Sequence, residues 1–404
     1  MRMCKEISKD LYYHGYKIQL FPTDEQKEFL DKCIDICRYM YNWTIEQEEA
    51  QYEKYIEGDA KYSFINFYEL VPVYTQLKKE LDFLNSVPVC TGRSGILRAI
   101  KAYKRFLDKK ARKPKFKSKK NCETNSFETR AERMRFDDNM LKIEGINTMI
   151  YTKYHTGLDG SFKQYKHAVI SRDNMGRYFV SFCILKPKHL DHFEKNNIKP
   201  LGRAIGIDLN VKKRFVLSTG EVYYGPDLSR ELVNLNNKQS RVTRDINRRK
   251  KAERTNPSKE YCQSKRVKKR LRAMQKQHKR VANITENFIQ TTTKQIINMR
   301  PKAIVMEDLE VVNMLTTNHG IAKNVRHANF GRCIEVMRNK CNKYGIPFIQ
   351  APKDYPSTQI CSSCGNIQEM NLNQKTYKCE KCGLVIDRDI NAALNLEHLA
   401  YAIA

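Results

Sequence analysis

The sequence has 404 residues, of which 41% are hydrophobic, so it can form two or three domains with substantial cores. Its 74 lysines and arginines outnumber its 45 aspartates and glutamates, and the formal net charge of +29 favours polyanionic partners, either nucleic acids or anionic membrane surfaces. No run of 18 apolar residues is present, which excludes a membrane-spanning helix and leaves nucleic acid as the expected partner.

The first part of the chain predicts a strand followed by helices. Residues 1–10 are charged and lack the apolar core of a signal peptide, so we expect an intracellular protein. Residues 14–20 alternate between apolar and polar side chains, as a half-buried strand does. Thr23 and Gln26 have the spacing of a capping box, which predicts the start of a helix, and helical patterns continue to about Leu107.

Two stretches carry most of the excess positive charge. Residues 101–120 contain 11 lysines and arginines with one acid, and residues 241–280 contain 17 with three acids. Stripes of one sign are typical of grooves for phosphate backbones. The alternatives are a solvated face or, for residues 109–120, a disordered linker. Apolar residues recur at helical spacing in the second stretch, which indicates a folded helix with one buried side. The side chains expected to contact phosphates are Lys115, Lys117, Arg241, Arg244, Arg248, Arg249, Lys265, Arg266, Lys269, Arg270, Arg272, Lys279 and Arg280.

After the first basic stretch, apolar and polar side chains again alternate with a period of two residues, as in strands. Residues 139–152 and 166–185 predict strands, and residues 173–176 have the composition of a hairpin turn. We therefore expect a small β-barrel that a helical insertion interrupts. A linker over residues 186–199 leads into the second half of the chain.

The second half predicts a different domain. Residues 204–209 form an apolar strand, and residues 214–218 and 221–224 predict its antiparallel partners. After the basic helical region, residues 303–306 predict another buried strand, and a helix and a strand at residues 348–349 follow. Three strands, a helix, a strand, a helix and a strand form the order of a ribonuclease-H-like fold, although a fold alone does not give a function.

Three acids stand at strand or helix ends in this half. Asp208 ends the first strand, Glu307 follows the later buried strand, and Asp389 lies at the start of the last helix. Phosphodiester hydrolysis by two metal ions needs such carboxylates, and Mg²⁺ prefers oxygen ligands. Each acid alone is also typical of a solvated strand end. Asp308 and Asp387 are neighbouring alternatives, although on a strand only one of Glu307 and Asp308 can face the metals.

Four of the 13 cysteines form two C-x-x-C knuckles. Cys361 and Cys364 make the first knuckle, Cys379 and Cys382 make the second, and a glycine follows each knuckle. This spacing is typical of a closed structural zinc site, which would supply the folding free energy of a small ribbon; the alternative is a redox pair. Other cysteines lie singly in apolar patterns, where reduced thiols act as small hydrophobes; these are Cys33, Cys37, Cys183, Cys333 and Cys341.

The order of these motifs resembles one family. Gly-Ile-Asp208, Met-Glu307-Asp-Leu, the two knuckles and Asp-Arg-Asp389-x-Asn-Ala-Ala resemble the TnpB proteins of insertion sequences, and also their relatives, the Fanzor proteins and the miniature type V CRISPR effectors. Residues 16–23 and 37–43 are similar to the TnpB opening, so the resemblance spans nearly the whole chain. Asn210 stands where the family often has glycine, and Ser357-Thr358 inverts a common pair; neither departure removes a ligand.

The resemblance implies an α+β multidomain architecture. A small, wedge-like β-barrel would comprise residues 1–23 and 126–200, with a helical recognition insertion over residues 24–125. A RuvC-like, RNase-H-like nuclease domain would comprise residues 201–355 and 384–404, with an inserted zinc ribbon over residues 356–383.

The resemblance also implies an RNA-guided, transposon-associated DNA endonuclease. It would cut double-stranded target DNA beside a short flanking motif at a single RuvC site, with Asp208, Glu307 and Asp389 holding two Mg²⁺ ions and the four cysteines holding one zinc ion. Base pairing with the guide RNA would supply the sequence specificity. One protein chain per RNA is expected, a dimer being the alternative. The location would be cytoplasmic and nucleoid-associated in a prokaryote, or nuclear for a eukaryotic relative.

Three alternatives stay open. A guided DNA-binding repressor would lack cleavage, although all three carboxylates are kept here. An unguided resolvase or transposase would not need so large a basic first half. A miniature type V CRISPR effector differs from a TnpB protein in its genomic neighbourhood, and the short length of the chain favours TnpB.

Overall fold

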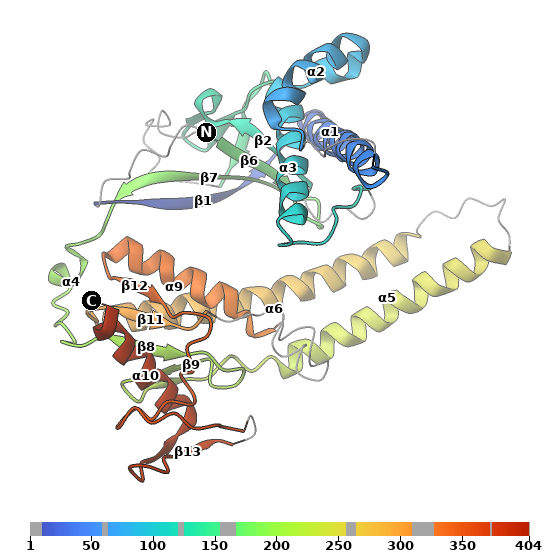
Figure 1. The fold of residues 1–404 in the computed structure, drawn as a ribbon. Helices are drawn as coiled ribbons and strands as arrows, with labels where there is room; N and C mark the ends of the chain where they lie inside the picture. The colour runs from blue at the N-terminus through green and yellow to red at the C-terminus, as the bar shows by residue number, and fades with distance from the viewer. Residues whose placement is uncertain are drawn as a thin grey trace. The chain divides into compact units, whose positions relative to one another are not determined.

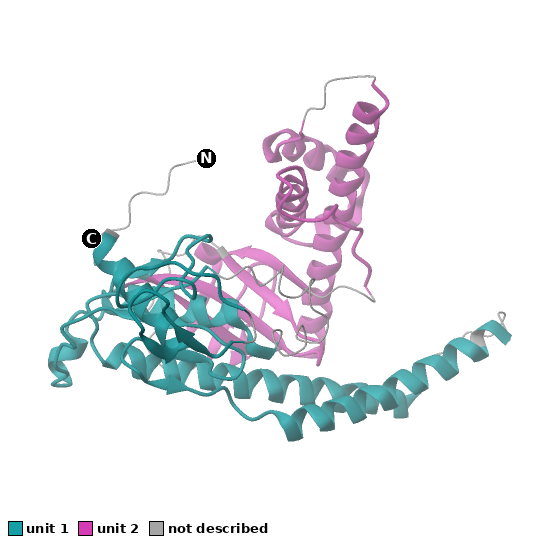
Figure 2. Cartoon of the chain, turned by 60° about the horizontal axis from the view of Figure 1, so that its bottom comes forward, with its two compact units in different colours: residues 1–12, 187–404 teal, residues 13–186 magenta. Residues whose placement is uncertain are grey.

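The computed structural model describes seven segments, which are residues 10–58, 64–119, 125–153, 167–255, 264–308, 327–371 and 374–403. Residue 120 and residues 256–263, which belong to the two basic stretches, lie outside the described residues. The chain divides into two compact units, Tyr13–Lys186 on the one hand and Met1–Tyr12 with Pro187–Ala404 on the other (Figure 2). Within the described segments, no helix combines the length and apolar character needed to cross a membrane.

A seven-stranded antiparallel sheet forms the base of the first unit, in the order β2-β6-β7-β1-β5-β4-β3. Its strands are β1 (Leu11–Phe21), β2 (Asn125–Arg130), β3 (Arg135–Asp137), β4 (Met140–Lys142), β5 (Ile150–Thr152), β6 (His167–Arg172) and β7 (Tyr178–Pro187). The two edge strands, β2 and β3, follow one another in the chain, separated only by the 3₁₀ turn η2 (Ala131–Arg133) and Met134. The sheet therefore curls. Its full closure into the expected β-barrel stays a prediction.

The hairpin turn predicted between β6 and β7 is confirmed. The amide of Gly176 donates to the carbonyl of Asp173 at 2.9 Å, and Gly176 has a φ of 78°, which a residue with a side chain rarely adopts. Asp173 also accepts a hydrogen bond from the side chain of Arg177 at 2.8 Å. The turn thus sets the pairing of Arg172 with Tyr178 and of the residues beyond them.

Three helices and a 3₁₀ turn complete the first unit. They are α1 (Asp24–Ile56), α2 (Phe67–Glu80), η1 (Asp82–Ser86) and α3 (Val89–Leu107). The predicted capping box at the start of α1 is confirmed, because Thr23 and Gln26 exchange hydrogen bonds of 3.0 and 3.3 Å. Leu30 and Met40 of α1 are fully buried in one core with sheet residues such as Ile170. The helices and the sheet belong to the same compact unit, and the finer domain boundaries stay a prediction.

A five-stranded sheet organises the second unit, in the order β10-β9-β8-β11-β12. Its strands are β8 (Ile205–Asp208), β9 (Phe215–Leu217), β10 (Val222–Tyr223), β11 (Ile304–Met306) and β12 (Phe348–Gln350). Strands β8, β9 and β10 pair antiparallel, as predicted, whereas β8, β11 and β12 run parallel. Every residue of β8, β9 and β11 is buried, which explains why these strands are continuous apolar runs rather than alternating ones.

The helices of the second unit are α4 (His192–Lys195), α5 (Ser229–Thr255), α6 (Lys265–Asn298), α9 (Phe330–Tyr344) and α10 (Arg388–Ile403). Helices α5 and α6 lie side by side and extend well beyond the sheet, whereas α9 lies along the inner part of α6 (Figure 1). Helix α9 ends at Gly345, whose φ of 71° is the left-handed conformation of a helix C-cap. A small hairpin of β13 (Thr376–Lys378) and β14 (Val385–Asp387) precedes α10.

Candidate metal centres and nucleic-acid surface

The sheet brings two of the three candidate carboxylates to one edge. Strands β8 and β11 are parallel neighbours, and Ile207 pairs with Met306. Asp208 directly follows Ile207, and Glu307 directly follows Met306. The two acids therefore lie side by side at the carboxyl edge of the sheet. Parallel strands thus place side by side two acids that are about a hundred residues apart in the chain.

Helix α10 brings the third carboxylate to the same place, because it lies directly on β8. A Cβ atom on Gly206 would lie 2.0 Å from the carbonyl oxygen of Ala393, so only glycine permits this approach. Arg203 holds a later turn of the helix through the buried Glu397, with its Nε 2.9 Å from the carboxylate. This packing places Asp389, the second residue of α10, near Asp208.

Burial and mutual repulsion perturb these carboxylates. Asp208 is only 7% exposed, and burial, followed by the charges of Glu307 and Asp389, raises the pKa of its carboxyl well above the ordinary value. Burial also raises the pKa of Glu307, and the hydrogen bond that Ser357 donates to its carboxylate opposes this effect. Hard divalent cations prefer carboxylate oxygens as ligands, and a cation bound here would relieve the repulsion among the acids.

The two neighbouring acids have other partners. Asp308 accepts a hydrogen bond from Nε2 of Gln350 at 2.7 Å, on the neighbouring strand β12. Asp387 caps α10 by accepting the amide N–H of Asp389 at 2.9 Å. Burial alone would raise the pKa of Asp387, but the contact with Lys213 Nζ at 2.6 Å outweighs it and keeps the pKa below its usual value.

Two polar side chains from the loop after β8 orient Asp389. Asn210 Nδ2 donates to its carboxylate at 3.2 Å, and Lys213 Nζ lies 3.4 Å from the same oxygen. The sequence shows Asn210 only as a departure from the glycine common in the TnpB family, and its contact with Asp389 gives that departure a role. Nothing in the sequence around Lys213 signals its contact with Asp389.

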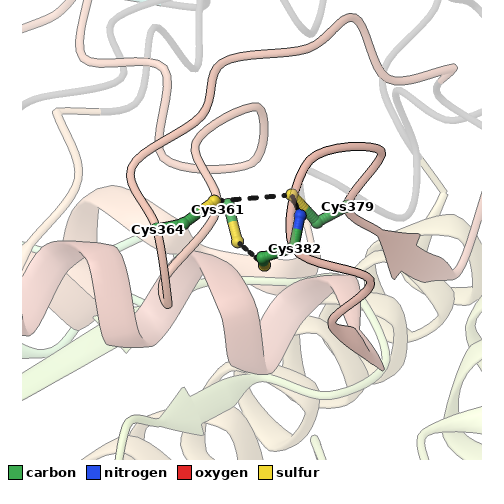
Figure 3. Close-up of side chains that lie close together, drawn as sticks. All are labelled: Cys361, Cys364, Cys379 and Cys382. Atoms are coloured by element: carbon green, nitrogen blue, oxygen red, sulfur yellow. Dashed lines mark hydrogen bonds between the residues drawn. The ribbon is translucent and has the colours of Figure 1, made fainter.

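The four cysteines converge with the geometry of a metal site (Figure 3). Their sulfur atoms all lie within 4.8 Å of one another, and the Sγ–Sγ separations of Cys361 with Cys382 and of Cys364 with Cys379 are both 3.6 Å. A disulfide would need a separation of about 2 Å. Tetrahedral zinc with bonds of about 2.3 Å would separate its sulfur ligands by about 3.8 Å, so the quartet fits one zinc ion.

The two knuckles have the same backbone geometry. The amide of Gly365 donates to the carbonyl of Cys361, and the amide of Gly383 donates to that of Cys379, at 2.9 and 3.0 Å. Both glycines have a positive φ, 71° and 73°. Backbone hydrogen bonds, first that from Cys382, lower the pKa of the Cys379 thiol to about 6. At Cys364 the backbone hydrogen bond from Asn366 would lower the pKa, but burial and the hydrogen bonds of the other three thiols raise it to about 12.

Two asparagines of α10 join the cysteine quartet to the carboxylates. Asn391 accepts the amide N–H of Ser362 at 3.0 Å and donates to the carbonyl of Ile360 at 2.7 Å. Asn395, one helical turn later, donates to the carbonyls of Ser357 and Ile360, both at 2.7 Å. Asn395 is not among the residues that the motifs predicted, although its i,i+4 spacing from Asn391 on one helix face is a usable signal.

The second basic stretch forms the α5–α6 pair. The predicted phosphate contacts that are exposed there are Arg241, Arg244, Arg248, Lys265, Arg266, Lys269, Arg272, Lys279 and Arg280. Arg249 and Arg270 are half-buried, and Arg270 is held by Asp245 at 2.6 and 2.8 Å. Arg270 therefore joins the two helices, and its role in phosphate contact stays a prediction. Val267, Leu271 and Met274 are half-buried, in agreement with one inward side.

The first basic stretch includes an extended segment that lies along α1. Asn42 donates to the carbonyl of Lys117 and accepts its amide N–H, at 2.9 and 2.8 Å. Lys113 pairs with Glu49 and Lys119 with Asp35, at 3.3 and 2.9 Å. These contacts argue against the disordered linker for residues 113–119. Lys117 is half-buried over the Tyr41 ring, whereas Lys115 is exposed.

The scattered cysteines are mostly core residues. Cys33, Cys37, Cys333 and Cys341 are buried free thiols, as predicted. The prediction is wrong for Cys183, which is exposed. It lies in β7, where the residues on either side of it point inward, so the alternation of the strand turns Cys183 outward.

Two segments match models of known families. Residues 330–396 match the Cas12f1-like TNB domain, and residues 13–57 match a helix-turn-helix domain named after OrfB of IS605. In this structure, residues 13–57 comprise most of β1 and the single long helix α1 rather than two helices.

Whole-length relatives agree with these matches. A Streptomyces pristinaespiralis protein named "Putative RNA-guided DNA endonuclease" is 26% identical over 95% of this chain and 88% of its own length. Protein InsQ of Escherichia coli K12, with the same designation, is 23% identical over 96% of this chain and 92% of its own. The fold resembles Cas12f1 in its complex with sgRNA and target DNA, with a TM-score of 0.50 and 17% identity over 93% of this chain and 83% of that chain. The resemblance that the motifs indicated is confirmed.

Proposed function

We propose that this relative of the TnpB proteins is an RNA-guided DNA endonuclease, which cuts double-stranded target DNA beside a short flanking motif. The observation that carries the proposal is the convergence of Asp208, Glu307 and Asp389 from β8, β11 and α10 at one edge of the sheet. The raised pKa values of Asp208 and Glu307 are typical of functional sites rather than of solvated strand ends. The names of the whole-length relatives support the same activity.

The strand order of the second unit supports a RuvC-like, RNase-H-like assignment. Three antiparallel strands are followed in the chain by two parallel ones. Asp208 lies at the carboxyl end of the first strand, β8, and Glu307 at that of the fourth, β11. Ligands of open sheets bind outside the carboxyl ends of the strands. The zinc ribbon would brace the start of α10, which carries Asp389, through Asn391 and Asn395.

Asp208, Glu307 and Asp389 would hold two Mg²⁺ ions. When bound there, such ions activate a water molecule and stabilise the leaving oxygen of a phosphodiester. Ser357 would fix the rotamer of Glu307, and Asn210 and Lys213 would fix that of Asp389. Asp308 would stay outside the ligand set because Gln350 engages it, and Asp387 because it both caps α10 and pairs with Lys213 at 2.6 Å.

The basic surfaces would bind the nucleic acids. The exposed arginines and lysines of α5 and α6, together with Lys115 and Lys117, would contact backbone phosphates of the guide RNA and the target DNA, so binding should weaken steeply with salt. The curled sheet and helices of the first unit would act as the wedge and recognition parts. Base pairing with the guide would supply most of the sequence specificity.

The proposal is tested by the RNA that the protein retains. The full chain, purified under nuclease-free conditions, should carry one discrete structured RNA with a variable 3′ end. That end specifies a target for a cleavage assay with a library of flanking sequences and added Mg²⁺. Asp354→Asn, which changes an exposed acid, is the matched control for Asp208→Asn. A random sample of cellular RNA would overturn the guided activity, and guided binding without cutting would favour a repressor.

A further inference from the structure

Arg214 is a buried arginine without a carboxylate partner. Its exposed fraction is 6%, and among the residues that the structure describes no carboxylate pairs with it. Burial lowers the pKa of its guanidinium, which nevertheless stays protonated. Burying a charge without a counter-ion costs free energy, so packing alone does not account for an arginine at this position.

The guanidinium of Arg214 joins two backbone segments. Its Nη1 donates to the carbonyl of Ala328, and its Nη2 donates to the carbonyl of Val211 at 3.1 Å. Val211 belongs to the loop after β8, and Ala328 lies two residues before Phe330, where α9 begins. A Cβ atom on Gly225 would lie 2.8 Å from the same Nη2, so the glycine leaves the room that the guanidinium occupies. A planar fork of donors is suited to such a double contact.

Arg214 lies at the edge of the sheet that carries the carboxylates. Strand β9 runs antiparallel to β8, and Val216 pairs with Asp208. Arg214 comes just before β9 begins at Phe215, so it lies at the edge where β8 ends. Because β8 and β11 are parallel, Glu307 follows its strand at this edge as well. The arginine and the proposed metal ligands therefore share one edge of the sheet.

The loop that Arg214 holds carries two side chains that contact a proposed metal ligand. Asn210 Nδ2 and Lys213 Nζ lie 3.2 and 3.4 Å from the carboxylate of Asp389. Val211, whose carbonyl accepts the hydrogen bond from Arg214, lies between them in the chain. Side chains that orient metal ligands contribute to metal affinity, so the position of this loop bears on the site.

We propose that Arg214 is a positioning residue of the carboxylate site. By fixing the Val211 carbonyl against the segment that enters α9, it keeps Asn210 and Lys213 at the distances at which they orient Asp389. The inference rests on the proposed function in one respect, since it takes the three carboxylates as ligands of divalent cations.

The test is the binding of Mn²⁺, used in place of Mg²⁺ because electron paramagnetic resonance measures its free concentration. Full-length protein is titrated without guide RNA or DNA, and Asp208→Asn identifies the binding that belongs to the carboxylate site. Arg214→Met, which keeps an unbranched side chain but no donor, should weaken that binding about fivefold, less than the loss of a direct partner of a ligand would. Arg214→Lys should weaken it about threefold, since an ammonium lacks the fork that reaches both carbonyls.

Arg98→Met is the matched control. Arg98 also donates to a backbone carbonyl, that of Ser126 at 2.6 Å, but in the other compact unit. Its loss should leave Mn²⁺ binding unchanged, whatever it does to the melting temperature.

A second arm removes the side chains that Arg214 would position. In protein that carries Asn210→Ala and Lys213→Ala, adding Arg214→Met should change Mn²⁺ affinity by less than about twofold, because the two effects are no longer independent. Melting temperatures show which variants are folded, and Arg214→Lys serves if Arg214→Met unfolds. Unmodified affinity in a folded Arg214 variant would overturn the proposal, and so would a loss that persists undiminished in the double variant.

The outcomes separate this role from the proposed function. Mn²⁺ binding that depends on Asp208 but not on Arg214 would leave guided cutting intact. A failure of guided cutting would leave Arg214-dependent binding intact, because the titration needs neither guide nor target. The absence of any binding that Asp208→Asn removes would overturn the metal site and this role together.

Discussion

The cysteine quartet and the carboxylate trio are both candidate metal sites, yet they form in different ways. The cysteines lie within 22 residues of sequence, and their sulfur atoms meet within 4.8 Å through two glycine-closed turns. The carboxylates span 182 residues and meet only because parallel strands and a docked helix bring them together. The cysteine site is built from local turns, so the spacing of its residues in the sequence predicts it. The carboxylate site is built by the topology of the sheet, so only the order of strands and helices indicates it.

The strongest test of this contrast removes one carboxylate. Asp208→Asn should lower target cleavage roughly a thousandfold while guide RNA binding is retained, because the amide is a poor ligand for hard cations in an otherwise intact fold. Cleavage of labelled target DNA and RNA retention are measured on the same preparation. Asp354→Asn should behave as the unmodified protein, and a cutting Asp208→Asn variant would refute the site.

A second test disrupts the cysteine site and measures the effect on the carboxylate site. Cys379→Ser should release zinc, and cleavage should fall about a hundredfold, since the ribbon would no longer hold Asn391 and Asn395 at the start of α10. Zinc content is measured by mass spectrometry alongside cleavage. Cys183→Ser, at an exposed single thiol, is the control. Full cleavage activity in a preparation shown to be free of zinc would mean that the carboxylate site does not depend on the cysteine site.

A third change tests the helix docking alone. Gly206→Ala should cost about 1–3 kcal/mol of stability and about tenfold in cleavage, because its Cβ would lie 2.0 Å from the Ala393 carbonyl and α10 would have to move. Gly331→Ala is the matched control, since a Cβ there meets nothing within 4 Å. Chemical denaturation and cleavage rates of both variants give the comparison; equal rates would mean that the position of α10 is unimportant.

The smallest expected effect is on the stability of the protein without added magnesium. The folded-state pKa of Asp208 lies above its unfolded value, so its contribution is most favourable below about pH 4 and is lost as the pH rises through the folded pKa. Asp208→Asn should therefore raise the melting temperature by a few degrees at pH 7 and have little effect near pH 3.5. A lower melting temperature at pH 7 would contradict the repulsion among the acids.

Parts of both units follow from short-range patterns. The apolar runs of β8 and β11 and the capping box at Thr23 each reflect a local rule, and the structure confirms them. The error at Cys183 shows the limit, because composition suggests burial whereas strand alternation decides which face a side chain takes. The average hydrophobicity of a strand does not tell which of its residues face the core, because that depends on the pairing register of the strand.

The sequence by itself determined the cysteine quartet, the excess positive charge and the three acids at element ends, because each depends on neighbours along the chain. Only the tertiary structure decided that Gln350 engages Asp308, that Lys213 engages Asp387, and that Asn395 ties α10 to the ribbon. It also assigned Arg270 to an ion pair inside the α5–α6 hairpin. Such partners lie up to 174 residues apart, and packing of whole elements, not local propensity, brings them into contact.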